Sequence, residues 1–152
     1  MYRFRSLSFV LLFVAVTVLP GVGHAAVVSL YFSEGGPGAL RSYDVATATL
    51  STVISGPGKV NGLAVDAQAG RVYWVQEDPD SVRAADLDGS NPMTLDGGSH
   101  ERPRFLGHDP VHGKVYWGDR TANRLRVANT DGTAVAQRTL HKNLDAPFDA
   151  DR

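Results

Sequence analysis

From residue 27 onward, apolar residues occur in short runs separated by turn residues, and no stretch shows convincing helical spacing. The segment 124–127 alternates between basic and apolar side chains, which is typical of a strand with one polar face. Two Asp-Gly pairs, Asp88-Gly89 and Asp131-Gly132, follow such runs. They are typical of two-residue hairpin turns in which both central residues have positive φ. The pattern predicts an all-β chain of short antiparallel strands.

This pattern repeats along the chain. The segment 62–74 returns as 105–117, with Asp, Gly, Tyr and Trp at the same positions 43 residues later, and a weaker copy lies upstream. Such a period is the signature of a repeat architecture. We expect units at about 27–60, 61–103 and 104–146, with another beginning at 147. The two clearer units are each expected to hold four strands, at about 61–66, 71–76, 81–87 and 92–95, and at about 104–109, 114–119, 123–129 and 134–140.

A pair of adjacent aromatic residues occurs once in each unit, as Tyr31-Phe32, Tyr73-Trp74 and Tyr116-Trp117. Adjacent residues on a strand point to opposite faces, so both faces of each sheet are expected to be buried. Stacked four-stranded sheets around an axis meet this requirement, whereas a two-sheet sandwich does not. Small residues in the first strands, Ala64 and Gly107, fit the crowded strand nearest the axis. The sequence predicts a β-propeller of four-stranded antiparallel blades, with about three blades present.

The repeated pattern Leu-x-x-Asp, Gly-Lys/Arg-Val-Tyr-Trp and Asp-Gly resembles the class B (YWTD) repeat of the low-density lipoprotein receptor, over about 27–148. The resemblance implies a six-bladed propeller of the TolB-like superfamily, in which the Asp of the tetrad bonds backbone amides between strands and blades. Asp119 matches that residue, whereas Gln76 and Glu34 replace it in the other units. The chain has no cysteine. The receptor's cysteine-rich neighbours are therefore absent, and its lipoprotein ligands are not carried over.

Residues 1–25 have the pattern of a secretory signal peptide. Two arginines precede an uncharged, mostly apolar run at 7–19, a Pro-Gly pair ends it, and small residues precede a cleavage site after Ala25. A membrane span needs about 20 apolar residues, and this run is shorter. We expect a mature protein of residues 26–152 that is exported to the periplasm or the extracellular space, without membrane association after cleavage.

The charges give little sign of a ligand. Fifteen basic and 16 acidic residues provide no electrostatic case for nucleic-acid binding. His108 and His112 are spaced like zinc ligands on a helix but fall on a strand end and a turn, so we expect structural roles. The acidic run 77–80 lacks the spacing of a calcium loop and is expected to be a solvated loop. Asp66 and Asp109 end their strands and are expected to cap the next turn. We predict no metal and no cofactor.

Two functions of different classes remain open. The chain has no recognisable catalytic motif, which favours a non-enzymatic propeller that binds an unknown protein or small ligand, or acts as a scaffold. The alternative is a fragment of a six-bladed enzyme of the lactonase or sugar-oxidising type. Such enzymes need unrepeated polar residues on the inner strands, where this chain offers Asn61 and Arg104. Arg124 and Arg126 share one strand face, which we interpret as a charged sheet edge.

Three units are too few to close a ring, because propellers generally have four to eight blades. The pattern also shows no copy of the first strand before Leu30. Two chains could close a six-bladed ring as a homodimer, each tail completing the other's first blade. Alternatively, the reading frame is truncated after Phe148; the short polar segment 149–152 favours this second explanation.

Overall fold

A computed structural model describes residues 15–19, 27–34, 38–97, 102–120 and 124–139. Every regular element among these residues is a strand, and the strands form three four-stranded antiparallel sheets. No helix in this part of the chain is long and apolar enough to cross a membrane. The predicted all-β architecture of four-stranded propeller blades is confirmed.

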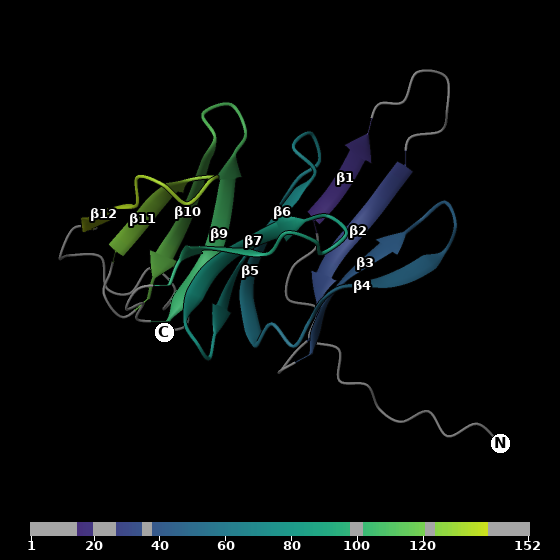
Figure 1. The fold of residues 1–152 in the computed structure, drawn as a ribbon, viewed down its shortest axis with the longest axis horizontal. Helices are drawn as coiled ribbons and strands as arrows, with labels where there is room; N and C mark the ends of the chain where they lie inside the picture. Colours follow the sequence, from purple (N-terminus) through teal and green to yellow (C-terminus); the bar gives the residue numbers. More distant parts are fainter. Residues whose placement is uncertain (1–14, 20–26, 35–37, 98–101, 121–123, 140–152) are drawn as a thin grey trace, which may run out of the picture.

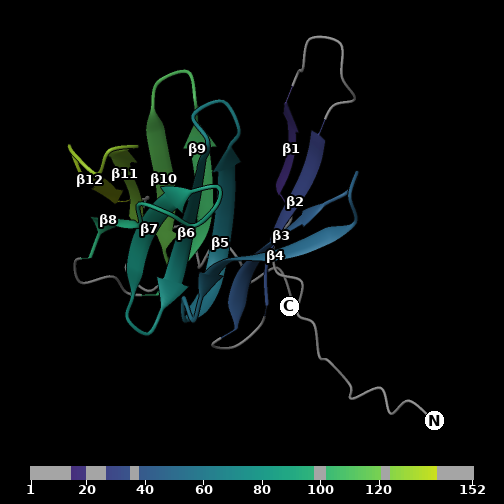
Figure 2. The same ribbon diagram turned by 45° about the vertical axis from the view of Figure 1, so that its right-hand side comes forward.

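Each sheet is a meander in which consecutive strands pair. Blade 1 contains β1 (Ala15–Leu19), β2 (Val27–Ser33), β3 (Ala39–Asp44) and β4 (Thr49–Ser55). Blade 2 contains β5 (Lys59–Asp66), β6 (Arg71–Glu77), β7 (Ser81–Asp86) and β8 (Met93–Asp96). Blade 3 contains β9 (Pro103–Asp109), β10 (Lys114–Asp119), β11 (Arg124–Asn129) and β12 (Ala136–Thr139). The first strands β1, β5 and β9 lie next to one another, and the sheets fan out from them (Figures 1 and 2).

The aromatic pair of blade 2 joins two separate cores. Trp74 packs in a core with residues of blade 1, and Tyr73 packs in a second core with residues of blade 3. Both side chains are about 1% exposed. The first core contains Tyr31, Leu40, Val53, Val60, Leu63, Val72, Trp74 and Ala85, and the second contains Tyr73, Val75, Val82, Ala84, Leu95, Val115, Trp117 and Ala128. Tyr31 and Tyr73 therefore face the following blade, and Trp74 and Trp117 face the preceding one.

This rule explains where the aromatic prediction fails. Tyr31 and Trp117 face blade 2 and are buried, whereas Phe32 and Tyr116 are only partly buried. These last two side chains point away from blade 2, where the described residues provide no further blade. The prediction that Tyr116 is a core residue is therefore wrong for this structure, because burial on the second face needs a neighbouring blade.

The two Asp-Gly turns differ from the predicted geometry. Only Gly89 and Gly132 have positive φ in these pairs, and their N–H groups donate to the carbonyl oxygens of Asp86 and Asn129. This is the pattern of a type I turn followed by a glycine in a three-residue loop. The Asp side chain explains the preference, because the Oδ1 of Asp88 accepts hydrogen bonds from the backbone and hydroxyl of Ser90.

Both turns also press against the preceding blade. A Cβ on Gly89 would lie 1.9 Å from the carbonyl oxygen of Val53 in β4, and one on Gly132 would lie 3.3 Å from the Cα of Leu95 in β8. A similar close approach joins the first strands, where a Cβ on Gly62 would lie 2.8 Å from the backbone nitrogen of Leu106. A Cβ on Gly107 would meet nothing within 4 Å. The crowded inner position is thus Gly62 and not the predicted Gly107.

The structure also contains a first strand in blade 1. β1 pairs with β2 in the place that β5 and β9 occupy in the other blades. The expectation that blade 1 lacks this strand is therefore wrong, because the apolar run that predicts a signal peptide also has the composition of a buried strand. Cleavage after Ala25 remains a prediction, and it would remove β1.

We predict that Trp117→Ala lowers the free energy of unfolding by about 3–5 kcal/mol, the usual cost of truncating a buried aromatic residue. Tyr116→Ala should cost clearly less, because its side chain is only partly buried. Urea denaturation of both variants measures the difference. Equal losses, or a loss below about 1 kcal/mol for Trp117→Ala, would contradict the assignment of faces.

A matched pair of variants can separate two contributions to stability: the packing of the Asp88-Gly89 turn against β4, and the backbone strain of a non-glycine residue at positive φ. Gly70→Ala and Gly89→Ala both place a Cβ at positive φ, which costs about 1–2 kcal/mol. Gly70 has open space around it, whereas Gly89 contacts β4. We expect the larger loss of thermal stability for Gly89→Ala. Similar losses in the two variants would show that the turn contributes nothing to blade packing.

Candidate functional site

Charged and polar residues gather at the end of blades 2 and 3 where β5 and β9 begin and β6 ends. We call this region the Glu77 end, after the residue at its centre. Glu77 Oε1 accepts a hydrogen bond from Asn61 Nδ2 at 2.8 Å and lies 3.4 Å from Arg104 Nη2. Its Oε2 lies 3.2 Å from Lys59 Nζ. Three strands of two blades therefore converge on one carboxylate.

The environment of Glu77 favours the ionised form. Its side chain is 16% exposed, and burial alone raises the pKa. The hydrogen bonds from Asn61 and Lys59, together with the positive charges of Lys59 and Arg104, outweigh burial and hold the pKa below its ordinary value. The carboxylate is thus a fixed negative charge that ties blade 2 to blade 3.

Asn61 is placed at the centre of this cluster by a β-bulge. The register of β5 with β6 shifts between Val60 and Gly62, which leaves Asn61 as the extra residue. Its Nδ2 also lies 3.3 Å from the carbonyl oxygen of Pro103. The side chain is buried, and its Oδ1 has no hydrogen-bond partner among the described residues. A buried acceptor of this kind is a group that a ligand can satisfy.

The acidic run 77–80 is a connecting element between blades as well as a loop. Glu77 is partly buried as described, and Asp80 Oδ2 accepts a hydrogen bond from the backbone of Arg102 at 3.2 Å. The prediction of a freely solvated loop is therefore correct only for its middle, where Asp78 and Pro79 are exposed. No group of three potential metal-ligating side chains is found in the described part of the chain.

Residues at the Glu77 end depart from the repeat. The positions 43 residues after Lys59, Asn61 and Glu77 are all arginines, namely Arg102, Arg104 and Arg120. Blade 3 thus presents basic groups where blade 2 presents basic, neutral and acidic ones. Arg102 and Arg120 are exposed. Because these side chains are not needed to make a blade, this end is where the sequence is free to encode recognition.

The tetrad residue Asp119 is buried and pairs with arginine. Arg126 Nε lies 2.6 Å from Asp119 Oδ2, and Arg126 Nη1 lies 3.5 Å from Asp96 Oδ2 of blade 2. The interpretation of Arg126 as part of a charged sheet edge is therefore wrong. β11 has a partner on each side, and Arg126 links two blades. Arg124 does lie near the surface and donates to Gln137 of β12.

An arginine occurs at the position of Arg126 in every blade. This repeat is present in the sequence, but our sequence analysis did not identify it. The arginine stands opposite the aromatic residue in the register pairs Phe32↔Arg41, Trp74↔Arg83 and Trp117↔Arg126. In blade 1 it pairs with Glu34 at 3.1 Å. In blade 2 the acid is replaced by Gln76, which accepts from Trp74 Nε1, and the guanidinium lies over the Trp74 ring at 5.9 Å.

The remaining predicted residues lie in turns and between blades. Asp66 Oδ1 accepts from the backbone of Ala69 at 2.8 Å, and Asp109 Oδ1 accepts from the backbone of His112 at 3.1 Å. His108 stacks on Tyr73 with ring centroids 5.0 Å apart, and its Nε2 lies 3.4 Å from Asp66 Oδ2. His108 thus contacts blade 2, and His112 lies in an exposed turn.

Comparison with known proteins defines the fold class. A chain of a nidogen/laminin complex matches with a TM-score of 0.65 and 24% identity, over 74% of this chain and 45% of that one. An auxiliary nutrient binding protein from Bacteroides thetaiotaomicron matches with a TM-score of 0.52 and 16% identity, over 72% and 32%. The protein has a β-propeller fold and spans less than half of either chain. No protein-family model matches it.

The Glu77 cluster predicts a pH-dependent contribution to stability. Because the folded pKa lies below the ordinary value of 4.5, the contribution is complete above that value and is lost as the pH falls through the folded pKa. Glu77→Gln should therefore be less stable than the parent near pH 7 and approach it at low pH. Asp78→Asn is the control, because its side chain is exposed. Urea denaturation between pH 3 and pH 7 measures both; parallel curves for parent and Glu77→Gln would refute the cluster.

Proposed function

We propose that this protein is an exported, non-enzymatic propeller repeat protein of the YWTD type, which binds a partner through the Glu77 end. The observation that carries the proposal is the distribution of unrepeated residues. The aromatic pairs and turns recur from blade to blade, whereas Lys59, Asn61 and Glu77 are all different residues at the corresponding positions of blade 3, and the charge differs at the last two. A rigid stack that varies at its strand ends is the usual arrangement of a binding surface.

The charge pattern indicates the kind of partner. Lys59, Arg102 and Arg120 are exposed beside the exposed Asp78, so the surface is polar and carries both signs of charge. Such a surface suits a protein segment with complementary charges. Both matched structures support a binding role, since one is a nidogen/laminin complex and the other is called a nutrient binding protein. The partners named for those two proteins are not assigned to this one.

A site-specific crosslinking experiment tests this proposal. A photoreactive benzoylphenylalanine is placed at Arg120, in the Glu77 end, or at Val111, which is 84% exposed at the opposite end of β9. We expect the probe at position 120 to form a crosslinked adduct of discrete mass with the bound partner. Arg102→Glu should reduce the yield of this adduct, and the probe at position 111 should form none. Equal labelling at both positions, or no adduct, would contradict the proposal.

The enzymatic alternative has its own test. One calcium per chain, removable by chelator with loss of lactone hydrolysis, would establish that alternative.

Export is tested separately by the intact mass of the mature protein. The apolar run and the small residues before Ala25 predict a chain that starts near Ala26. The mass of protein recovered from outside the cytosol of the producing cell should therefore lack residues 1–25. A mass that retains them would overturn the signal-peptide prediction and keep β1 in blade 1. Light scattering of the same sample distinguishes a homodimer from a monomer.

A further inference from the structure

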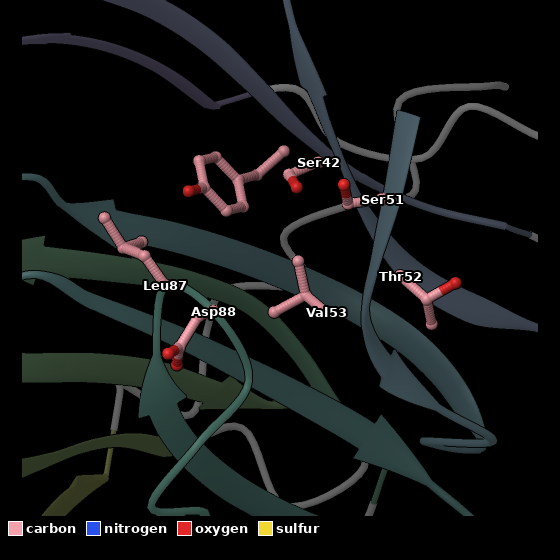
Figure 3. A pocket seen from close by; sticks show the side chains of 7 residues that line it. Ser42, Ser51, Thr52, Val53, Leu87 and Asp88 are labelled. Carbon is pink, nitrogen blue, oxygen red and sulfur yellow. The ribbon is translucent and has the colours of Figure 1, made fainter. Parts of the chain in front are cut away.

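A cavity of about 480 Å³ lies between blade 1 and the turn that joins β7 to β8 in blade 2. Figure 3 shows Ser42 and Ser51 on one side of it and Leu87 and Asp88 on the other. Tyr31 also lines the cavity. The turn lies beside the β5–β6 hairpin, since Leu87 N–H donates to the carbonyl oxygen of Gly70. The cavity is therefore distinct from the Glu77 end, which lies at the other end of β6.

Three residues that carry hydroxyl groups are paired in a row across the strands of blade 1. Tyr31 pairs with Ser42 in the β2–β3 register, and Ser42 pairs with Ser51 in the β3–β4 register. The three side chains therefore lie on the same face of blade 1, the face that Tyr31 turns toward blade 2. Hydroxyl groups both donate and accept hydrogen bonds, so the row can adapt to either kind of partner.

The next interface provides an internal comparison. The corresponding row of blade 2 is Tyr73, Ala84 and Met93, again paired across the strands. Here Ala84 is fully buried and Met93 packs against the core shared with blade 3. The same architecture thus closes without a polar row when the two serines are replaced by apolar residues. The serines of blade 1 are not required by the fold.

A second difference lies on the opposite wall. Thr130 of blade 3 lies close enough to the hydroxyl of Tyr73 to act on its pKa, which burial raises and Thr130 lowers. At the interface between blades 1 and 2, the residue in the place of Thr130 is Leu87, which has no hydroxyl group. Burial and the negative charge of Asp88 raise the pKa of Tyr31, so its hydroxyl stays protonated and can donate. Tyr31 therefore has an apolar residue in blade 2 where Tyr73 has a threonine in blade 3.

We propose that this cavity binds a neutral, hydroxyl-rich molecule of monosaccharide size. The polar groups on its walls are hydroxyls and one carboxylate, the combination that satisfies several sugar hydroxyls at once. Val53 and Leu87 supply apolar surface for the C–H face of such a molecule. The charge of Asp88 disfavours anions. A lone carboxylate that already accepts two bonds from Ser90 is a weak site for a cation.

The cavity is of a suitable size for this ligand. Small-molecule sites typically have volumes of about 300–1,000 Å³. One side is formed by the three outer strands of blade 1, and the other is the turn held in place by the contact of Gly89 with Val53. The site therefore forms when blades 1 and 2 pack together. It uses no residue of β1, so cleavage at Ala25 would leave all of its lining residues in the chain.

The test titrates the purified protein with glucose, galactose, mannose and N-acetylglucosamine, followed by amide shifts in NMR spectra. Glucuronate and ethanolamine are the anionic and cationic comparisons. We expect saturable shifts at Ser42, Ser51 and Asp88 with at least one neutral sugar, at least tenfold tighter than with glucuronate or ethanolamine. No saturable shift with any neutral sugar would overturn the proposal, and tighter binding of glucuronate or ethanolamine would overturn the ligand class.

The decisive variant copies blade 2 into blade 1. Ser42→Ala with Ser51→Met reproduces Ala84 and Met93, and it should weaken sugar binding at least tenfold while the protein remains folded. Ser51→Met alone is a second variant in case the double variant does not fold. Ser55→Met is the matched control, because Ser55 is exposed on the same strand and does not line the cavity. Unchanged affinity in a folded Ser51→Met variant would overturn the proposal. Because none of these residues belongs to the Glu77 end, failure here leaves the crosslinking result unaffected.

Discussion

The structure depends on burying an aromatic side chain on each face of the same sheet. In blade 2, Tyr73 and Trp74 are adjacent on β6 and therefore point in opposite directions. Removing both from water requires a sheet on each side, and blades 1 and 3 provide them. Burying an aromatic residue contributes several kcal/mol, more than most single contacts between the blades can supply. The stacking of blades follows from this requirement.

Close packing of the blades requires places where no side chain intervenes. The turn glycines Gly89 and Gly132 lie against the preceding blade. Gly62, in the inner strand β5, lies against the neighbouring inner strand β9. The glycines thus act both at positive φ in the turns and as points of close backbone approach. Where a larger side chain reaches a neighbouring blade, it carries its own partner, as Arg126 does with Asp119 and Asp96. A charge buried between blades would otherwise be costly.

Once the repeat satisfies packing, its exceptions become informative. Each interface contains one clear exception to the repeat. Between blades 1 and 2, Ser42 and Ser51 occupy positions that are apolar in blade 2. Between blades 2 and 3, the Glu77 carboxylate contacts basic and amide groups. Comparison of equivalent positions within one chain separates residues needed to build a blade from residues that are free to vary. Both sites that we propose rest on this internal comparison.

The sequence by itself determined the strands of blades 2 and 3, the repeat and the faces that carry aromatic residues, because all three are properties of local order along the chain. Contacts between blades decided the rest. Gly62 rather than Gly107 is the crowded glycine, and Tyr116 is only partly buried, because each depends on what lies opposite. Likewise, Glu77 contacts Arg104 only when the two blades pack together. The local sequence around either residue does not predict this contact. Periodicity specifies which way a side chain points, whereas its partner is set by the tertiary structure.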